Sequence, residues 1–320
     1  MMHRDGRADG AQMRATNKQK ARLMLEALLL VLLIAAVIVT GVRGTLCPPN
    51  SSYEILTSAV TPPKDGPLLT VTLLDVGQGD AILLQSPNGR TMLIDAGPED
   101  AFDAIRAALR VYEIKQLDAV VATHPHADHI GSMADVLKRY PVGAFFTTDV
   151  PETTIVYEQM LRALQRNGCP VYNTASGMEI VWDDAVSVKV LNPIAGEPAE
   201  DANNASIVLR VCYGSTRFLL AADLESAGER RLLDTYGNDR LRADVLKVGH
   251  HGSDTSSCKA FLDAVHPSCA IISDGRNNAY GHPHPDVLNR LQAIGASVYR
   301  TDTDGVITLF SDGDTITIVP

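Results

Sequence analysis

The chain has 320 residues, 45% hydrophobic and 21% charged, which suffices for one large domain or two small ones with a sizeable core. Its formal net charge of −10 argues against a broad electrostatic surface for nucleic acid, although a local basic groove is compatible with it. The five cysteines are scattered without a CxxC pair, which indicates free thiols or at most one or two bridges and leaves the redox compartment open.

The amino-terminal region predicts a membrane anchor. Residues 23–42 form an apolar stretch of the length that spans a bilayer, with Glu26 at the interface. Basic residues are concentrated before it, in residues 1–22, so the positive-inside rule predicts a basic cytoplasmic tail and an extracytoplasmic remainder. A signal peptide cleaved near residues 41–45 is the alternative, and the remainder would then be secreted.

Residues 43–67 are predicted to form a linker, because they are rich in Pro, Ser and Thr and lack strand or helix periodicity. Short apolar runs separated by turn residues then predict adjacent strands at 68–76, 80–85 and 91–96. The spacing of apolar residues next predicts a helix at 101–113, a buried strand at 117–123, and helices at 130–140 and 152–166.

The second half of the chain begins with predicted strands at 178–181, 186–191, 205–213 and 216–221. It then alternates between helices at 225–235, 256–265 and 284–293 and strands at 243–248, 268–273, 297–300, 305–310 and 314–319. Strand-rich and alternating stretches thus occur in both halves. This pattern predicts that residues 68–320 form an α/β domain of two sheets packed face to face with helices outside, an αββα sandwich.

Seven of the nine histidines fall into three short clusters, and each cluster follows a predicted strand: His124/His126/His129, His250/His251 and His282/His284. Loops at strand ends are where a rigid scaffold usually presents functional side chains. The first cluster, HPHADH, places three imidazoles and the carboxylate of Asp128 within six residues. This composition is typical of a divalent transition-metal site, whereas a polar helix start capped by Asp128 would not need three histidines.

HPHADH resembles the HxHxDH signature of the metallo-β-lactamase superfamily. Five further segments resemble, in the same order, the carboxy-terminal hydrolase domain of ComEC-type DNA-uptake competence proteins: LDVGQGDAILLQSPNG (74–89), IDAG (94–97), FLLAADLE (218–225), DVLKVGHHGS (244–253) and NNAYGHPHP (277–285). The resemblance covers about residues 68–320 and implies a metal-dependent hydrolase of the metallo-β-lactamase fold.

The resemblance also implies a role for each matching residue. His124 and His126 would hold a first metal ion, Asp128, His129 and His250 a second, and Asp223 would bridge the two. His250 is preferred to His251 because it comes first after the strand at 243–248. We expect two divalent ions, Zn²⁺ foremost, with Mn²⁺ a rival where oxygen ligands predominate.

One departure makes the two metal sites unequal. Members of the superfamily generally supply another histidine to the first metal from the segment before the bridging Asp. No histidine lies between His129 and His250 in this chain, and Asn203, Asn204 and Ser206 occupy part of that stretch. The first site is therefore expected to bind its ion more weakly.

Two metal ions can stabilise both the attacking and the leaving oxygen of a phosphodiester. Asp128 is expected to orient the attacking water, and His251 or His282 to donate a proton to the leaving oxygen. Asp95 is expected to accept a hydrogen bond from a ligand histidine, and Lys247 either to contact substrate or to pair with Asp244. The residues expected to contact substrate or support the ligands are Asp75, Gln78, Asp80, Asp95, Asn204, Ser206, Lys247 and Ser253.

The leading hypothesis from the sequence is a membrane-bound nuclease or phosphodiesterase that acts on DNA outside the cytoplasm, together with a DNA-uptake machinery. One alternative is a metallohydrolase of a lactone, thioester or β-lactam, because the same fold supports all these reactions. The other is a non-catalytic metal-binding component of an envelope DNA-import complex.

Overall fold

The computed structural model describes residues 60–62, 66–197 and 201–320. The chain divides into two compact units, Met1–Asn50 and Ser51–Pro320, and the described residues all belong to the second. The predicted basic tail, the anchor at 23–42 and most of the predicted linker lie outside the described residues. Within the described residues no helix is both long and apolar enough to cross a membrane.

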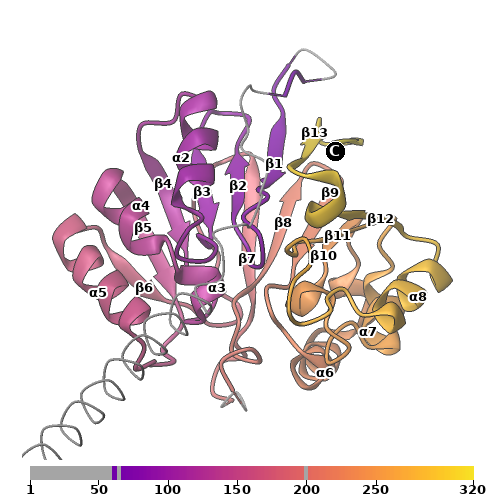
Figure 1. Cartoon of the computed structure of the whole chain (residues 1–320). Coiled ribbons are helices and arrows are strands. Elements are labelled where there is room, and N and C mark those ends of the chain that lie inside the picture. Colours follow the sequence, from indigo (N-terminus) through magenta and orange to yellow (C-terminus); the bar gives the residue numbers. More distant parts are fainter. Residues whose placement is uncertain (1–59, 63–65, 198–200) are drawn as a thin grey trace, which may run out of the picture. The chain divides into compact units, whose positions relative to one another are not determined.

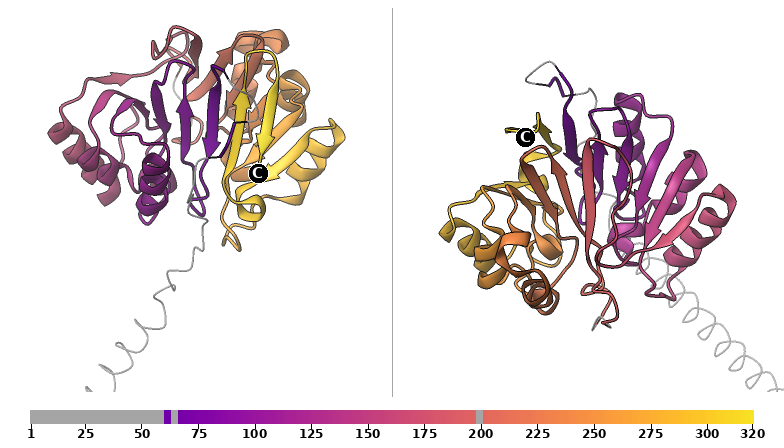
Figure 2. Two further views of the ribbon diagram at one scale, coloured as in Figure 1. Left: turned by 90° about the horizontal axis from the view of Figure 1, so that it is seen from above. Right: turned by 180° about the vertical axis from the view of Figure 1, so that it is seen from behind.

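The described residues build two mixed sheets (Figures 1 and 2). The first sheet has eight strands in the order β14-β13-β1-β2-β3-β4-β5-β6 and is parallel from β3 to β6. Its strands are β1 (Leu69–Leu73), β2 (Ile82–Gln85), β3 (Thr91–Ile94), β4 (Leu117–Val121), β5 (Val142–Thr147), β6 (Val171–Asn173), β13 (Ile307–Ser311) and β14 (Ile316–Val319).

The second sheet has six strands in the order β12-β11-β10-β9-β8-β7, and it is antiparallel from β7 to β9 and parallel from β9 to β12. Its strands are β7 (Val186–Asn192), β8 (Val208–Tyr213), β9 (Thr216–Leu220), β10 (Val245–Lys247), β11 (Cys269–Ile272) and β12 (Ser297–Arg300). Long crossovers that contain helices join the parallel strands, as parallel pairing requires.

Helices cover the outer face of each sheet (Figure 1). One hydrophobic cluster lies between the sheets and includes Val71, Leu84, Leu209 and Phe218. A second packs the first sheet against the helices that follow its strands, and a third does the same for the second sheet. The helices are α2 (Phe102–Val111), α3 (Ala127–Ile130), α4 (Met133–Arg139), α5 (Ile155–Asn167), α6 (Ser226–Leu241), α7 (Lys259–Val265), α8 (Pro285–Ala293), α9 (Thr301–Asp304) and the 3₁₀ turn η1 (Gly249–Gly252). The predicted αββα sandwich is confirmed in this part of the chain.

The structure differs from the sequence-based elements in several places, and the short helix α9 is among the elements that were not predicted. Strands β5 and β6 were not predicted, because β5 carries no alternation and all three residues of β6 are exposed. Residues 178–181 form only an isolated bridge through Glu179 rather than a strand. Helix α6 continues to Leu241, across a non-helical Gly237.

The described cysteines, Cys169, Cys212, Cys258 and Cys269, are free thiols.

The turn between β1 and β2 packs directly on the HPHADH segment. The backbone N–H of Asp80 donates a hydrogen bond to the carbonyl of Asp128 at 3.2 Å. Gly79 has φ +144°, and a Cβ at this position would lie 2.1 Å from the carbonyl oxygen of Asp128. A glycine is therefore required here both for its backbone conformation and for the close approach of the two segments.

We predict that Gly79→Ala destabilises the fold and displaces HPHADH, because the added methyl group overlaps Asp128. The matched control is Gly89→Ala, since Gly89 also has a positive φ (+79°) but a Cβ there meets nothing within 4 Å. Backbone strain alone costs about 1 kcal/mol at Gly89, whereas strain plus overlap costs about 3 kcal/mol or more at Gly79. Urea denaturation measures the free energy of unfolding of both variants. If the two variants lose equal stability, the close approach at Gly79 is not what requires a glycine there.

Candidate metal centre

The site residues follow the carboxyl ends of strands in both sheets. Asp95 follows β3 and His124 follows β4, while Asp223 follows β9 and His251 follows β10. Because β3 and β4 are parallel, as are β9 and β10, each pair of strand ends meets at one edge of its sheet. Side chains separated by more than a hundred residues in the sequence are thereby brought together.

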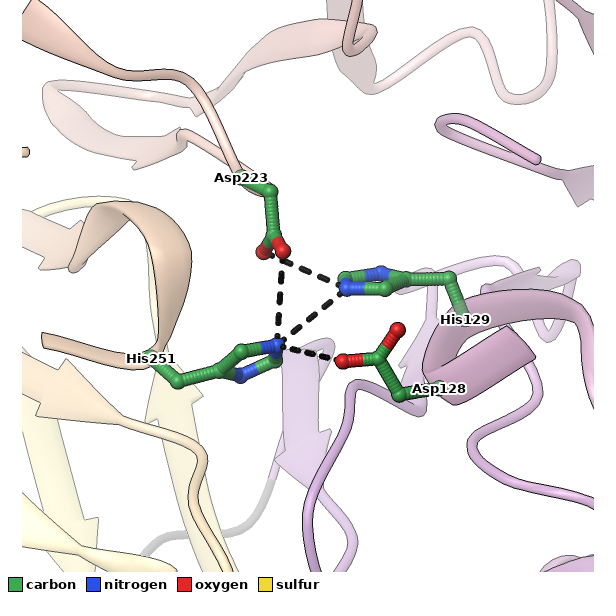
Figure 3. A group of neighbouring side chains, drawn as sticks. All are labelled: Asp128, His129, Asp223 and His251. Atoms are coloured by element: carbon green, nitrogen blue, oxygen red, sulfur yellow. Dashed lines mark hydrogen bonds and ion pairs between the residues drawn. The ribbon is translucent and has the colours of Figure 1, made fainter. Parts of the chain in front are cut away.

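Four side chains form a compact cluster of possible metal ligands: Asp128, His129, Asp223 and His251 (Figure 3). One ligand atom from each lies within 4.8 Å of all the others. His251 Nε2 lies 3.3 Å from Asp128 Oδ2, 3.3 Å from His129 Nε2 and 3.5 Å from Asp223 Oδ2. Apart from Asp128, whose side chain is 33% exposed, these side chains are buried.

The geometry corrects the choice between the two adjacent histidines. His251 is buried, and its Nδ1 lies 2.8 Å from the carbonyl oxygen of Ser273, so its Nε2 faces the cluster. His250 is partly exposed, and its Nδ1 lies 3.0 Å from Glu225 Oε1. Its Nε2 reaches only to 3.9 Å from Asp223 Oδ2. The predicted place of His250 in this group therefore belongs to His251.

The backbone explains why sequence order misled this choice. His250 and His251 both adopt positive φ angles, 46° and 51°, inside the turn η1. A left-handed conformation at two consecutive non-glycine residues is uncommon, so the order of residues after the strand does not show which side chain points inward. Such backbone strain is often found at functional sites, where surrounding contacts hold it in place.

His124 and His126 lie beside the cluster, and the ring centroid of His124 is 4.1 Å from that of His129. His124 Nε2 lies 3.1 Å from His126 Nδ1 and 3.8 Å from Asp223 Oδ2. The second carboxylate oxygen, Oδ1, lies 3.2 Å from His129 Nε2. The Asp223 carboxylate thus lies within reach of His124 as well as of His129 and His251, as a bridging carboxylate would have to. His124 and His126 are not part of the compact four-residue cluster.

Hydrogen bonds fix the orientation of the ligand imidazoles. Asp95 Oδ2 lies 2.7 Å from His129 Nδ1, which is the contact predicted for this residue. Asp95 also accepts hydrogen bonds from the backbone and hydroxyl of Thr123, at 2.8 and 2.7 Å. The Thr123 hydroxyl lies 3.2 Å from His124 Nδ1 as well. One buried network therefore positions histidines from both halves of the site.

Lys247 has a different partner from the one suggested by the sequence. Its Nζ lies 2.5 Å from Asp80 Oδ2 and donates a hydrogen bond to the carbonyl of Ala222 at 3.0 Å. The carboxylate of Asp244 instead accepts a hydrogen bond from the backbone of Arg217. Lys247 is 1% exposed and does not line the pocket described below, so it balances buried charge and does not face substrate.

The remaining predicted residues divide into one that faces the pocket and four that support the backbone. Gln78 lines the pocket, and its Oε1 accepts the N–H of Gly275 at 3.2 Å. The other four make local or structural contacts: Asp75 with Gly77 N, Asn204 with Gly228 N, Ser206 with Asp223 N and Ser253 with the Thr255 hydroxyl. Ser206 thereby supports a residue of the cluster, which is one of the roles expected for it.

A pocket of about 390 Å³ opens over the cluster. It contains predicted residues, among them His126, Asp128, Asp223, His251 and His282. It also contains four residues with polar side chains that were not among the predicted site residues: Glu152, Thr154, Asn203 and Tyr280. Glu152 and Thr154 precede a helix far from any histidine, so the sequence carried no signal for them. Tyr280 lies within the NNAYGHPHP segment, so it could have been predicted as a site residue from the sequence.

The charges of the cluster are arranged to hold a cation. Burial alone would lower the pKa of His251, but the carboxylates of Asp223, Asp128 and Asp80 raise it to about 10. Likewise, burial opposes the charged form of His129, yet Asp223 and Asp95 raise its pKa above the usual value. Buried Asp223 Oδ1 lies 3.2 Å from His129 Nε2 and 4.0 Å from Lys247 Nζ. The carboxylates therefore stabilise positive charge where the ligand atoms converge, and the donor set fits Zn²⁺ or Mn²⁺.

His282 differs from the ligand histidines. Burial lowers its pKa to about 4, and the neighbouring imidazoles of His251 and His250 act in the same direction. His282 is therefore neutral at pH 7, so it can donate a hydrogen bond but is a poor general acid. Its ring centroid lies 5.6 Å from that of His250 and 6.4 Å from that of His251.

Residues 74–273 match the metallo-beta-lactamase superfamily. The chain belongs to this superfamily. It is 34% identical over 254 residues to ComE operon protein 3 of Bacillus subtilis, which covers 74% of this chain and 32% of that protein. It is 35% identical over 239 residues to competence protein ComA of Neisseria gonorrhoeae, which covers 74% of this chain and 31% of that protein. The chain thus spans about a third of the length of these curated relatives.

Among solved structures, the metallo-beta-lactamase fold protein YhfI of Bacillus subtilis is similar, with a TM-score of 0.49 and 12% identity over 73% of this chain and 96% of that one. The predicted resemblance to ComEC-type competence proteins is confirmed by the curated relatives rather than by such structures. The metallo-β-lactamase fold accounts for a metal centre between two sheets, where this chain has its cluster.

We predict that His251→Ala weakens metal binding at the cluster, whereas His250→Ala leaves it nearly intact. Loss of a ligand should exceed the roughly 10- to 100-fold effect of losing a supporting partner. Metal content per chain after gel filtration, measured by plasma mass spectrometry, checks this. Retention of metal by His251→Ala together with its loss from His250→Ala would show that His250 is the ligand.

We predict that Lys247→Met lowers the free energy of unfolding by about 3–5 kcal/mol, because it removes the nearest partner charge of the buried Asp80. Adding Asp80→Asn to Lys247→Met removes that charge and should recover part of the loss. Chemical denaturation of the single and double variants measures the coupling. A Lys247→Met protein of normal stability that loses turnover would instead indicate substrate contact.

Proposed function

We propose that this chain is a metal-dependent phosphodiesterase that cleaves DNA. The observation that carries the proposal is the position of Asp223, whose carboxylate oxygens lie 3.8 Å from His124 Nε2, 3.2 Å from His129 Nε2 and 3.5 Å from His251 Nε2. A carboxylate shared by two ligand groups suits a pair of divalent ions. Such ions, when bound, neutralise the charge on a phosphodiester and activate water for attack on phosphorus.

The chain's own residues supply orientation and proton acceptance. Burial would raise the pKa of Asp128, but the imidazoles of His129 and His251 lower it below the usual range. Asp128 is therefore ionised at pH 7, and its exposed part lies in the pocket, where it can accept a hydrogen bond from an attacking water. His282, neutral and in the same pocket, can donate a hydrogen bond to a phosphate oxygen.

The choice of DNA as substrate is supported by the relatives. Two of them are named competence proteins or products of a competence operon, and a third is recombination protein 2 of Haemophilus influenzae. Names of this kind point to proteins that handle DNA. We further propose that residues 23–42 anchor the chain in the cell membrane with the hydrolase domain outside the cytoplasm. There it would act with a DNA-uptake machinery.

We predict that the full chain in detergent, loaded with Zn²⁺ or Mn²⁺, cleaves single-stranded DNA and bis(4-nitrophenyl) phosphate. Asp128→Ala should reduce turnover by about 10²-fold or more while leaving the fold intact, because it removes both a metal ligand and a proton acceptor. Removal of metal by a chelator should abolish cleavage, and adding metal back should restore it. Circular dichroism of each variant checks folding.

The same preparation separates the proposed function from its alternatives. A protein that holds both ions, leaves every phosphodiester intact and opens a lactone, thioester or β-lactam belongs to the acyl-hydrolase class. A protein that holds both ions and turns over no member of either panel is a metal-binding component without catalysis. Either result overturns the proposed function.

A further inference from the structure

Tyr280 stands at the rim of the metal pocket with its ring open to solvent. It is 66% exposed, and among the exposed large hydrophobic side chains of the described residues it alone lines this pocket. Its ring stacks on that of His282, with centroids 5.6 Å apart and an interplanar angle of 23°. One face of the tyrosine is thus covered by a pocket histidine, and an aromatic surface continues from the solvent towards the metal ligands.

The loop that carries Tyr280 is held in place by one side chain. Asn278 Nδ2 donates to the carbonyl oxygens of Gly275 and His282, at 3.0 and 2.7 Å. Asn278 Oδ1 accepts the backbone N–H groups of Tyr280 and His282, at 3.1 and 3.0 Å. Gly275 in turn donates to Gln78, on the turn beside the cluster. The aromatic surface is therefore preorganised, which reduces the ordering entropy that a ligand must overcome.

The charge of the pocket does not favour binding of a nucleic acid, so affinity for one needs another source. None of the described residues that line it is Lys or Arg, and three are carboxylates: Asp128, Glu152 and Asp223. Bound metal can neutralise only the phosphate at the reaction centre. Within this pocket, affinity for a neighbouring nucleotide then has to come from an interaction that does not depend on charge, and base stacking on an aromatic ring is such an interaction.

We propose that Tyr280, backed by His282, is a stacking platform for the nucleobase next to the cleaved phosphodiester, and that it makes the site select single-stranded nucleic acid. This inference rests on the proposed phosphodiesterase function. In a duplex each base is stacked and paired, so its face is not free, whereas an unpaired base can lie on an aromatic ring. Stacking requires only a π face, so the platform accepts all four bases.

The test compares Tyr280→Ala, Tyr280→Phe and Tyr280→Trp in the full chain with Mn²⁺ or Zn²⁺. Tyr280→Ala should raise KM for a single-stranded oligonucleotide by about 5- to 150-fold with little change in kcat, because stacking holds substrate and transition state alike. The Phe and Trp variants should retain the wild-type KM. On an oligonucleotide that is abasic at the cleavage site, wild type and Tyr280→Ala should behave equally.

Tyr172→Ala is the matched control. Tyr172 is also an exposed tyrosine, at 44%, and its ring also stacks on a neighbour, Phe146, at 5.3 Å. It lies on β6 and does not line the metal pocket, so its loss should leave KM unchanged. Thermal unfolding of both alanine variants shows whether either change acts through the fold.

The outcomes distinguish the platform from the function on which it rests. If the wild type cleaves DNA and Tyr280→Ala has the same KM, the stacking platform is contradicted but the proposed function is not. Equal rates on duplex and single strand overturn the selection of single strands. A wild-type protein that holds metal and cleaves no phosphodiester overturns the proposed function, and the platform with it.

Discussion

The negative charge of the buried Asp223 has to be balanced inside the protein, and much of the site is arranged around that requirement. An ionised carboxylate that is buried without a partner costs several kcal/mol. The imidazoles of His129 and His251 lower the pKa of Asp223 far enough to keep it ionised despite burial. These two histidines come from different sheets, so the cluster forms only when the two sheets are packed together. Folding and assembly of the metal centre are therefore the same event for these residues.

The backbone around the cluster is strained in a way that serves the same purpose. Asp95, Ala222 and His251, which lie at or beside the cluster, have positive φ angles of 61°, 48° and 51°. Each follows a buried strand, and a sharp turn there redirects the side chain or its neighbour towards the centre. Such conformations cost about 1–3 kcal/mol each and persist where surrounding contacts over-determine them. Here the contacts are the Asp95–Thr123 hydrogen bonds and the Lys247–Ala222 hydrogen bond.

The sequence predicted those parts of the site that local composition reveals. The HPHADH segment could be recognised as a metal-binding segment because it places several possible ligands within six residues. The contact between Asp95 and a histidine of the cluster was also predicted correctly. The choice between His250 and His251 was not readable, because it depends on a left-handed turn that no residue type at these positions requires. The Lys247–Asp80 pair joins residues 167 positions apart in different sheets. Strand β6 escaped notice because it is short and exposed, so neither alternation nor an apolar run marks it.

Polar residues in the histidine-free stretch between His129 and His250 hold the backbone near Asp223 in place. The backbone N–H of Asp223 donates to the Ser206 hydroxyl at 3.4 Å, and Ile207 N donates to the carbonyl of Thr123. The Asn192 side chain secures this segment by donating to the carbonyls of Asn204 and Ser206. The segment thus ties the shared carboxylate to the strand end that presents His124, without adding an imidazole. Of His124 and His126, only His126 lines the pocket, so an ion held by this pair would be within reach of a substrate oxygen through that side.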